Sequence, residues 1–466
     1  MLTTIVKQEW RRLRRHRLAQ AVLTLVVVLV SVIVLSHWQL QQNAIDAQKT
    51  WQQTADEFWQ AQPERHPHRV AHYGHVVFRE HSPLSFLDVG VAPFNGNFLF
   101  LEAHKQNASA IKSYPVNASS LAIGFPSVAT FFWFVWPLVL IILAYGAISD
   151  EKQMNRYTWL LSLGLTKRTL MSAKAVFYIV LSTIIVAFIA CVAALFIALT
   201  AHVSAQHWFS FAAMMASFWL YSIMWVLIIV TVSAVAKNNL QSLLSSLAVW
   251  LFICVLVPKM AAPIGQSLAP VPEHANFVSQ LKKDVKAVGD SHNPNDPYFN
   301  SFKQSVLDQY GVDTIEELPV NYNGLIMAEG ERITSDIYQR HLHTLEQTFA
   351  EHERTHQWLS WLSPTLVLSK VSVLLSGNDR ASIDEFAKQA EAYRLSLIQA
   401  LNKVHTEQID HHNDRAQKIS GDVWRDMALF EFEMKPAQLP LKNLLPFLVW
   451  LVLIAGLFYR VGAKQS

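Results

Sequence analysis

The chain has 466 residues, of which 52% are hydrophobic and 16% charged, and its formal net charge is +3 at pH 7. These averages agree with a membrane chain and add little beyond that, because they combine apolar spans with large soluble parts. The small net charge decides nothing by itself, and no nucleic-acid partner is predicted. The distribution of charge along the chain is more informative than its sum.

Residues 1–17 have the pattern of an amphipathic helix. Basic residues fill the positions between apolar ones that recur at helical spacing, namely Leu2, Ile5, Val6, Trp10 and Leu13. Such a helix lies in the interface of the inner leaflet, where a tryptophan on the apolar face is favourable. A plain topology signal is the alternative interpretation.

Six apolar stretches follow, each long enough as a helix to cross a hydrocarbon core of about 30 Å. They cover residues 18–38, 126–146, 175–200, 208–236, 240–258 and 441–459. The first is too long for a typical signal-peptide core and has no small-residue cleavage site after it, so we expect it to remain as a span. No stretch contains Asp or Glu, and Lys442, at an edge, is the only Lys or Arg. Because proton and ion pathways need ionisable groups in the membrane, no proton relay is predicted.

The basic residues predict the orientation of these spans. Lys and Arg are concentrated in residues 1–17 and in the connection 147–174, so both segments are predicted to be cytoplasmic. Six spans then place the tail 460–466 on the same side and the polar segments 39–125 and 259–440 outside. Both cysteines, Cys191 and Cys254, lie within spans, so the external segments are expected to fold without disulfides.

The predicted fold class is an all-α polytopic membrane protein with a mainly helical external domain built from the two polar insertions. In the second insertion, Ile333, Ile337, Leu345 and Phe349 mark one face of a long helix. A capping box at Ser382 and Glu385 is predicted to open an antiparallel partner helix. The stripe of that partner comprises Phe386, Ala390, Tyr393, Leu397, Leu401 and Val404. Repeated Pro and Gly residues in the first insertion predict loops and short strands packed on these helices.

The connection 147–174 has an order of residue types that an ordinary loop does not need. Acidic Asp150 and Glu151 come first, a ridge of Trp159, Leu160 and Leu161 follows, and the basic turn contains Lys167 and Arg168. This order predicts a short helix with one apolar face and a charged rim, which suits docking in a groove of another protein. A simple positive-inside loop is the alternative.

This connection resembles the ABC-2 type exporter permeases, which are membrane subunits of ATP-driven transporters. The resemblance rests on Ile148-Ser149-x-Glu151, Leu160-Leu161-Ser162 and the basic turn before Lys174. The chain departs from the family pattern at Asn155-Arg156, Gly164 and Ala173, where Gly-Thr, Pro and Gly are usual. The six spans and the basic N-terminus also resemble this family. Residues 83–90 and 318–325 resemble a bacterial subfamily whose periplasmic part is a domain of unknown function.

The resemblance implies that the connection inserts into a separate ATPase subunit and that the chain is not an enzyme on its own. The implied rim contacts are Glu151, Arg156, Lys167 and Arg168, next to Asp150, and the implied ridge is Trp159, Leu160 and Leu161. The chain has no phosphate-binding loop motif, so ATP is expected on the partner and no cofactor in this chain. The implied partners are two ATPase copies, a second identical or closely related permease protomer and membrane lipid, in a bacterial inner membrane with both termini cytoplasmic.

The sequence also leaves the cargo contacts and the mode of action open. Cargo contacts are expected from aromatic and hydroxyl groups, namely Phe131, Phe132, Trp133, Trp136, Ser217 and Ser222, although the same residues suit lipid contact or packing. A mechanical complex that moves no cargo and acts on a periplasmic partner is an alternative to transport. The sequons at Asn107 and Asn117 matter only in a pathway that glycosylates.

A different class of protein is suggested by the motif from His352 to His356. The sequence His-Glu-x-x-His, with Glu353, matches zinc peptidases, but the two histidines also continue a helical packing stripe and no third ligand is evident. Other histidines cluster in the insertions and are expected to be solvated surface residues, with a metal-handling surface as the alternative. These are His66, His68, His72, His75, His81, His405, His411 and His412.

Overall fold

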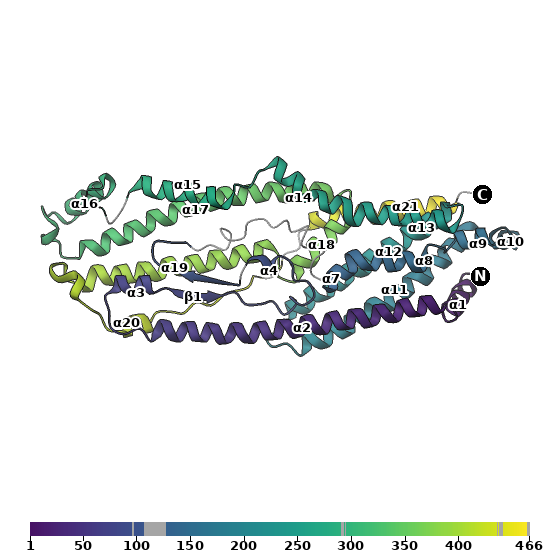
Figure 1. Ribbon diagram of the computed structural model, residues 1–466, viewed down its shortest axis with the longest axis horizontal. Helices are drawn as coiled ribbons and strands as arrows, with labels where there is room; N and C mark the ends of the chain where they lie inside the picture. The colour runs from purple at the N-terminus through teal and green to yellow at the C-terminus, as the bar shows by residue number, and fades with distance from the viewer. Residues whose placement is uncertain are drawn as a thin grey trace.

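The computed structural model describes residues 1–95, 97–106, 127–289, 293, 295–435, 437 and 441–463. The sequons at Asn107 and Asn117, the predicted span start at residue 126 and residues 464–466 lie outside this described part. The molecule is elongated (Figure 1). Both chain ends lie at one end of it, together with helices α1 (Leu2–Leu13), α9 (Ser149–Gln153) and α10 (Arg156–Ser162). The helix predicted for residues 1–17 is therefore present as α1.

Six helical segments among the described residues are long and apolar enough to cross a membrane, which confirms the predicted polytopic class. They are α2 (Arg17–Gln60), the run of α7 (Val128–Thr130), η1 (Phe131–Val135), α8 (Trp136–Ala144) and α9, then α11 (Lys167–Ala198), α12 (Ala205–Val235), the run of α13 (Asn239–Trp250), η2 (Leu251–Leu256) and α14 (Val257–Leu268), and α21 (Leu441–Ala463).

Helix α2 is longer than the predicted span of residues 18–38. It has 44 residues, which at 1.5 Å per residue gives a rod of roughly 66 Å. The apolar pattern ends near residue 38, but no Pro or Gly interrupts the chain until Pro63, so the helix continues. One rigid element therefore runs from the end that holds α1 along the membrane helices and into the extramembrane part (Figure 1).

Helix α12 is the most buried of the membrane helices, and it packs against α8, α11, α13 and α21. The aromatic side chains expected to contact cargo lie in this packing. Phe132 stacks on Phe218 with ring centroids 4.5 Å apart, and the Trp136 indole donates a hydrogen bond of 2.9 Å to Ser222. Phe131, Phe132 and Trp136 are buried. The structure thus places them in the core of the bundle, as the packing alternative predicts.

Two π-helical segments, η1 and η2, interrupt the membrane helices and expose carbonyl groups that side chains of other helices satisfy. The Tyr221 hydroxyl donates to the Trp133 carbonyl at 3.1 Å, and the Trp250 indole donates to the Phe134 carbonyl at 3.1 Å. Ser363 donates to the Ile253 carbonyl at 2.6 Å. Because an unpaired carbonyl is costly inside a membrane, these hydrogen bonds hold the irregular segments in place.

The distal domain consists of the described residues of 39–106 and 259–435. In addition to the outer half of α2 and to α14, it contains α3 (Pro67–Tyr73), β1 (His75–Phe78), α4 (Ala92–Asn95), β2 (Phe98–Leu101), α15 (His274–Val288), α16 (Pro297–Tyr310), η3 (Ile315–Glu317), α17 (Tyr322–Ser360), α18 (Pro364–Leu375), α19 (Arg380–Gln408), η4 (His411–Ala416) and α20 (Asp422–Arg425). The short strands predicted for the first insertion are present, because β1 pairs with β2 in antiparallel register.

The two predicted long helices are α17 and α19, and they are antiparallel. At one end of the helix pair the Asn321 backbone N–H donates a hydrogen bond to the Thr406 carbonyl. Towards the other end Lys388 forms an ion pair with Glu346. The predicted stripe on α19 is buried or partly buried against its neighbours. The predicted capping box is wrong, because the helix begins earlier, with Asp379 as its N-cap.

Helix α18 joins the distal domain to the membrane helices. Its residues Val367, Leu368 and Val371 belong to the same buried core as the membrane helices. The Tyr221 hydroxyl also lies 2.7 Å from Thr365 Oγ1. The two parts of the molecule therefore share one packed core through α18.

Candidate functional site

The predicted helix of the connection 147–174 forms as two short helices, α9 and α10, at the end of the molecule that holds both termini (Figure 1). Asn155 joins them with a left-handed backbone at φ 54°, a conformation that Asn tolerates better than most residues. Gly164 turns the chain into α11 with φ 83°. The Ser233 hydroxyl of α12 accepts hydrogen bonds of 3.0 Å from the amides of Ile148 and Ser149, which fixes the start of α9.

An ionic cluster of six side chains holds α9 and α10 to the helices beside them. It consists of Glu9 and Arg12 of α1, Asp150 and Glu151 of α9, Arg156 of α10 and Lys174 of α11. Three carboxylates thus face three cations, and the cluster has no net formal charge. Four separate helices contribute to it.

Lys174 lies at the centre of this cluster and is 1% exposed. Its Nζ is 2.8 Å from a carboxylate oxygen of Glu9 and 2.8 Å from one of Glu151. The second Glu151 oxygen accepts a hydrogen bond of 2.7 Å from Arg156, and Asp150 pairs with both Arg12 and Arg156. A buried charge is costly without its partners, so this arrangement strongly favours one relative position of α1, α9 and α11.

Further polar contacts tie α9 to α12 and α13. The Lys152 ammonium donates to the carbonyls of Ala234 and Ala236 at 2.6 and 3.0 Å, where the cation complements the C-terminal end of α12. Asn239 at the start of α13 donates to Asp150 at 3.2 Å and accepts from Ser149 at 2.7 Å. A push on α9 would therefore be transmitted to α1, α11, α12 and α13 together.

The outer surface of α9 and α10 carries three large apolar side chains among polar ones. Trp159 is 62% exposed, and Met154 and Leu163 are exposed to a similar degree. Leu160 and Leu161 are half-buried and pack against the core of the bundle. The predicted ridge is thus divided, since its leucines anchor α10 while the tryptophan extends away. We refer to Met154, Trp159 and Leu163 as the exposed ridge.

The charged residues predicted for the rim differ in their placement. Glu151 is not available as a rim contact, because it is buried and saturated by Lys174 and Arg156. Asp150 is equally internal. Arg156 is half-exposed, and its hydrogen bond to Glu151 raises its pKa, so it stays charged. Lys167 is half-buried, and the Arg168 guanidinium lies 4.2 Å from the centre of the Tyr459 ring of α21.

Sequence reasoning missed three members of the ionic cluster, namely Arg12 and Lys174, which pair with Asp150 and Glu151, and Glu9, which pairs with Lys174. A signal for Glu9 was present, because it is the only acidic residue among the first 17 and interrupts a basic run. Lys174 and Arg12 looked like ordinary positive-inside residues. Only the packing of α1 against α11 separates these two from the other basic residues of these segments.

The motif from His352 to His356 has a packing role in this structure. His352 Nε2 lies 2.7 Å from the carbonyl oxygen of Ala269, Glu353 pairs with Lys370, and burial lowers the pKa of His356. Three groups of metal-ligating side chains converge among the described residues, and neither His352 nor His356 belongs to one. The third ligand that a peptidase zinc needs is therefore not found in the described part of the chain.

The expectation of solvated surface histidines is wrong for several residues of the distal domain. His75 is buried and bonds Asp56 at 2.9 Å and Tyr393 at 3.2 Å. His66 and His405 are buried around Asp414, at 3.1 and 2.9 Å. Burial alone would raise the Asp414 pKa, but hydrogen bonds from Asn323, His405 and Asn321 outweigh it and lower the pKa to about 2. The carboxylate is thus already satisfied by these donors.

Comparison with known proteins bears on the distal domain only. No curated protein matches the chain. Residues 276–433, which include α16, α17, α18 and α19, match the family described as a domain of unknown function, DUF3526. This match lies within the second insertion.

Proposed function

We propose that this chain is the membrane subunit of an ATP-driven complex of the ABC-2 exporter type and that α9 and α10 receive the motion of a separate ATPase subunit. Under this proposal α9 and α10 face the cytoplasm of a bacterium, and the distal domain lies in the periplasm. A second protomer, identical or closely related, would complete the complex with two ATPase copies.

The single observation that carries the proposal is the contrast between the two sides of α9 and α10. The inner side is locked by the ionic cluster and by Ser233, whereas the outer side presents the three apolar side chains of the exposed ridge. Exposed apolar groups beside charged ones are typical of protein interaction sites. Arg156 of α10 and Arg168 near the start of α11 are also exposed, and their charges favour an acidic rim on the partner.

The test uses two exposed tryptophans with the same exposed fraction. Trp159 on α10 and Trp51 on α2 are each 62% exposed. The tagged chain is purified gently from its native membrane, the co-purifying ATPase is identified and ATP hydrolysis is measured. Loss of a central interface anchor costs about 2 kcal/mol or more, so Trp159→Glu should reduce ATPase association by at least about 30-fold. Trp51→Glu should retain both the partner and its hydrolysis.

Two outcomes would overturn the proposal. One is recovery of the wild-type chain without an ATPase under conditions that preserve the bundle. The other is an ATPase that stays bound equally well to the wild type and to Trp159→Glu. Circular dichroism of both variants shows whether the helices are retained, since each substitution changes an exposed side chain.

A second candidate function is transmission of force to a periplasmic partner without cargo. Two observations favour it over transport. The aromatic groups expected to contact cargo are packed in the core, and both α2 and α18 connect the membrane helices rigidly to the distal domain. Hydrogen exchange of the complex with and without ATP tests it: nucleotide-dependent protection should change in α17 and α19. Unchanged protection there would count against force transmission.

A further inference from the structure

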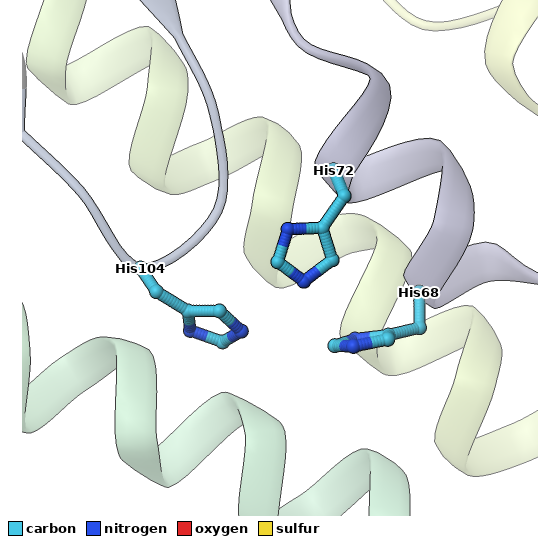
Figure 2. A group of neighbouring side chains, drawn as sticks. All are labelled: His68, His72 and His104. Atoms are coloured by element: carbon cyan, nitrogen blue, oxygen red, sulfur yellow. The ribbon is translucent and has the colours of Figure 1, made fainter.

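Three histidines from two segments of the first insertion converge in the distal domain (Figure 2). His68 and His72 are one turn apart on α3, and His104 follows β2 in a loop that faces that helix. Figure 2 shows the three imidazole rings turned towards a common space. One ligand nitrogen from each ring lies within 4.8 Å of those from the other two.

These distances are close to those of a metal site. Three nitrogens bound to a tetrahedral zinc, each about 2.0–2.1 Å from the ion, lie roughly 3.3 Å from one another. Small rotations of the rings would therefore bring the three nitrogens onto one ion. His72 is exposed and the other two are half-buried, so an ion can reach the site from solvent.

A buried carboxylate orients one of the three rings. Glu331 of α17 is fully buried, and its Oε1 lies 2.8 Å from His104 Nδ1. The same carboxylate accepts a hydrogen bond from the backbone amide of His104, whose φ of 63° is uncommon for a residue other than glycine. A carboxylate on Nδ1 fixes the tautomer that leaves Nε2 as the metal ligand and increases its basicity.

The charge around Glu331 also suits a cation. Arg394 of α19 donates to Glu331 at 2.9 Å and to Glu391 at 2.8 Å, so two carboxylates share one guanidinium. Glu331, Glu391 and Arg394 together therefore carry one net negative charge next to the three imidazoles. Imidazole ligands favour zinc and the neighbouring late transition metals over magnesium or calcium.

We propose that His68, His72 and His104 bind a divalent late transition metal of the zinc class, with Glu331 as the positioning residue and a fourth ligand position open to water. The ion would fasten the loop after β2 to α3 and, through Glu331, to α17. This inference does not depend on the proposed function, because it concerns only groups within the distal domain.

The test is titration of the purified full chain, carrying a tag without histidine, with Zn²⁺ and with Co²⁺. We expect one tight Zn²⁺ per chain and a Co²⁺ absorption spectrum with the intense visible bands of tetrahedral coordination. His72→Gln, His68→Gln and His104→Gln should each weaken binding by more than about 10-fold and abolish those bands. The matched control is His412→Gln, because His412 belongs to a different, exposed histidine group.

Three results would overturn the assignment. The first is a wild-type Co²⁺ spectrum of weak, six-coordinate type. The second is equal binding by His72→Gln, which alters an exposed side chain and should fold normally. The third is a loss in His412→Gln as large as in the three ligand variants, which would show adventitious binding by surface histidines. The wild-type Co²⁺ spectrum tests the assignment of the metal site even where a variant is unstable.

Discussion

Replacing Lys174 by methionine should loosen α1 from the helices beside it. Lys174 is the cation shared by Glu9 and Glu151, and both of its ion pairs are 2.8 Å long. Methionine fills a similar volume but leaves Glu9 buried, with no other cation of the described residues at ion-pair distance. Glu151 keeps Arg156, so the uncompensated charge is mainly that of Glu9.

The size of this effect follows from the cost of a broken buried pair. Removing one partner of such a pair typically costs about 3–5 kcal/mol, whereas an exposed ion pair contributes about 0–1 kcal/mol. Arg156→Met is therefore the matched control, because Arg156 belongs to the same cluster but is half-exposed. The double variant Lys174→Met with Glu9→Leu should recover most of the loss. In this double variant the guanidiniums of Arg12 and Arg156 still face the carboxylates of Asp150 and Glu151. The introduced methionine and leucine are both uncharged, so no buried charge is left without a partner.

Hydrogen exchange measures this loss of free energy directly, because the opening of α1 exposes its backbone amides without requiring the whole chain to unfold. A loss of about 3–5 kcal/mol lowers the protection factors of the α1 amides by a factor on the order of 10² to 10³ or more. The fall cannot exceed the protection that α1 has in the wild type. Arg156→Met should change the protection of the α1 amides by less than about fivefold. The reasoning fails if Lys174→Met exchanges like the wild type, or if adding Glu9→Leu makes the exchange faster still.

Two further predictions concern the distal domain. Burial and the nearby charge of Arg79 lower the pKa of His81 to about 4, while an unfolded histidine titrates near 6.5. The unfolded chain therefore binds the proton first, and stability should fall by up to about 3 kcal/mol between pH 6.5 and pH 4. His81→Gln should flatten this part of a plot of the thermal midpoint against pH, and an unchanged slope would contradict the assignment. Gly324→Ala should cost about 1–3 kcal/mol, because its Cβ would lie 2.5 Å from the Thr406 backbone nitrogen and force α17 from α19. Gly456→Ala, where no described residue lies within 4 Å of the new Cβ, should not lower the midpoint, and equal losses in both would refute the packing argument.

The sequence was a good guide wherever the signal was local and periodic. Six apolar stretches of the right length became six membrane helices, and the stripe that includes Phe386 and Leu401 became the buried face of α19. The start of α19 was predicted incorrectly because Asp379 and Ser382 both suit an N-cap. In the structure Asp379 caps the helix and Ser382 donates to its carboxylate at 2.5 Å. Local preference alone does not choose between two such residues.

The site was less predictable because its contacts join distant parts of the chain. Glu9 and Lys174 are 165 positions apart, and Glu331 and His104 are 227 apart. Composition marked the connection 147–174 as unusual, but it could not show that its acidic residues point inward. The same charge pattern fits a solvated rim and a buried cluster, and only the position of α1 beside α11 distinguishes them.

The contacts of Tyr221 explain how one end of the molecule would act on the other. Its hydroxyl contacts the Trp133 carbonyl in η1, Cys254 in η2 and Thr365 at the start of α18. Three irregular or terminal segments therefore meet at one buried side chain of α12. Helix α12 also carries Ser233, which holds the start of α9. A displacement of α9 along α12 would thus reach α18 through a single helix. Such a displacement would exchange hydrogen bonds at the π-helical segments rather than break the apolar core.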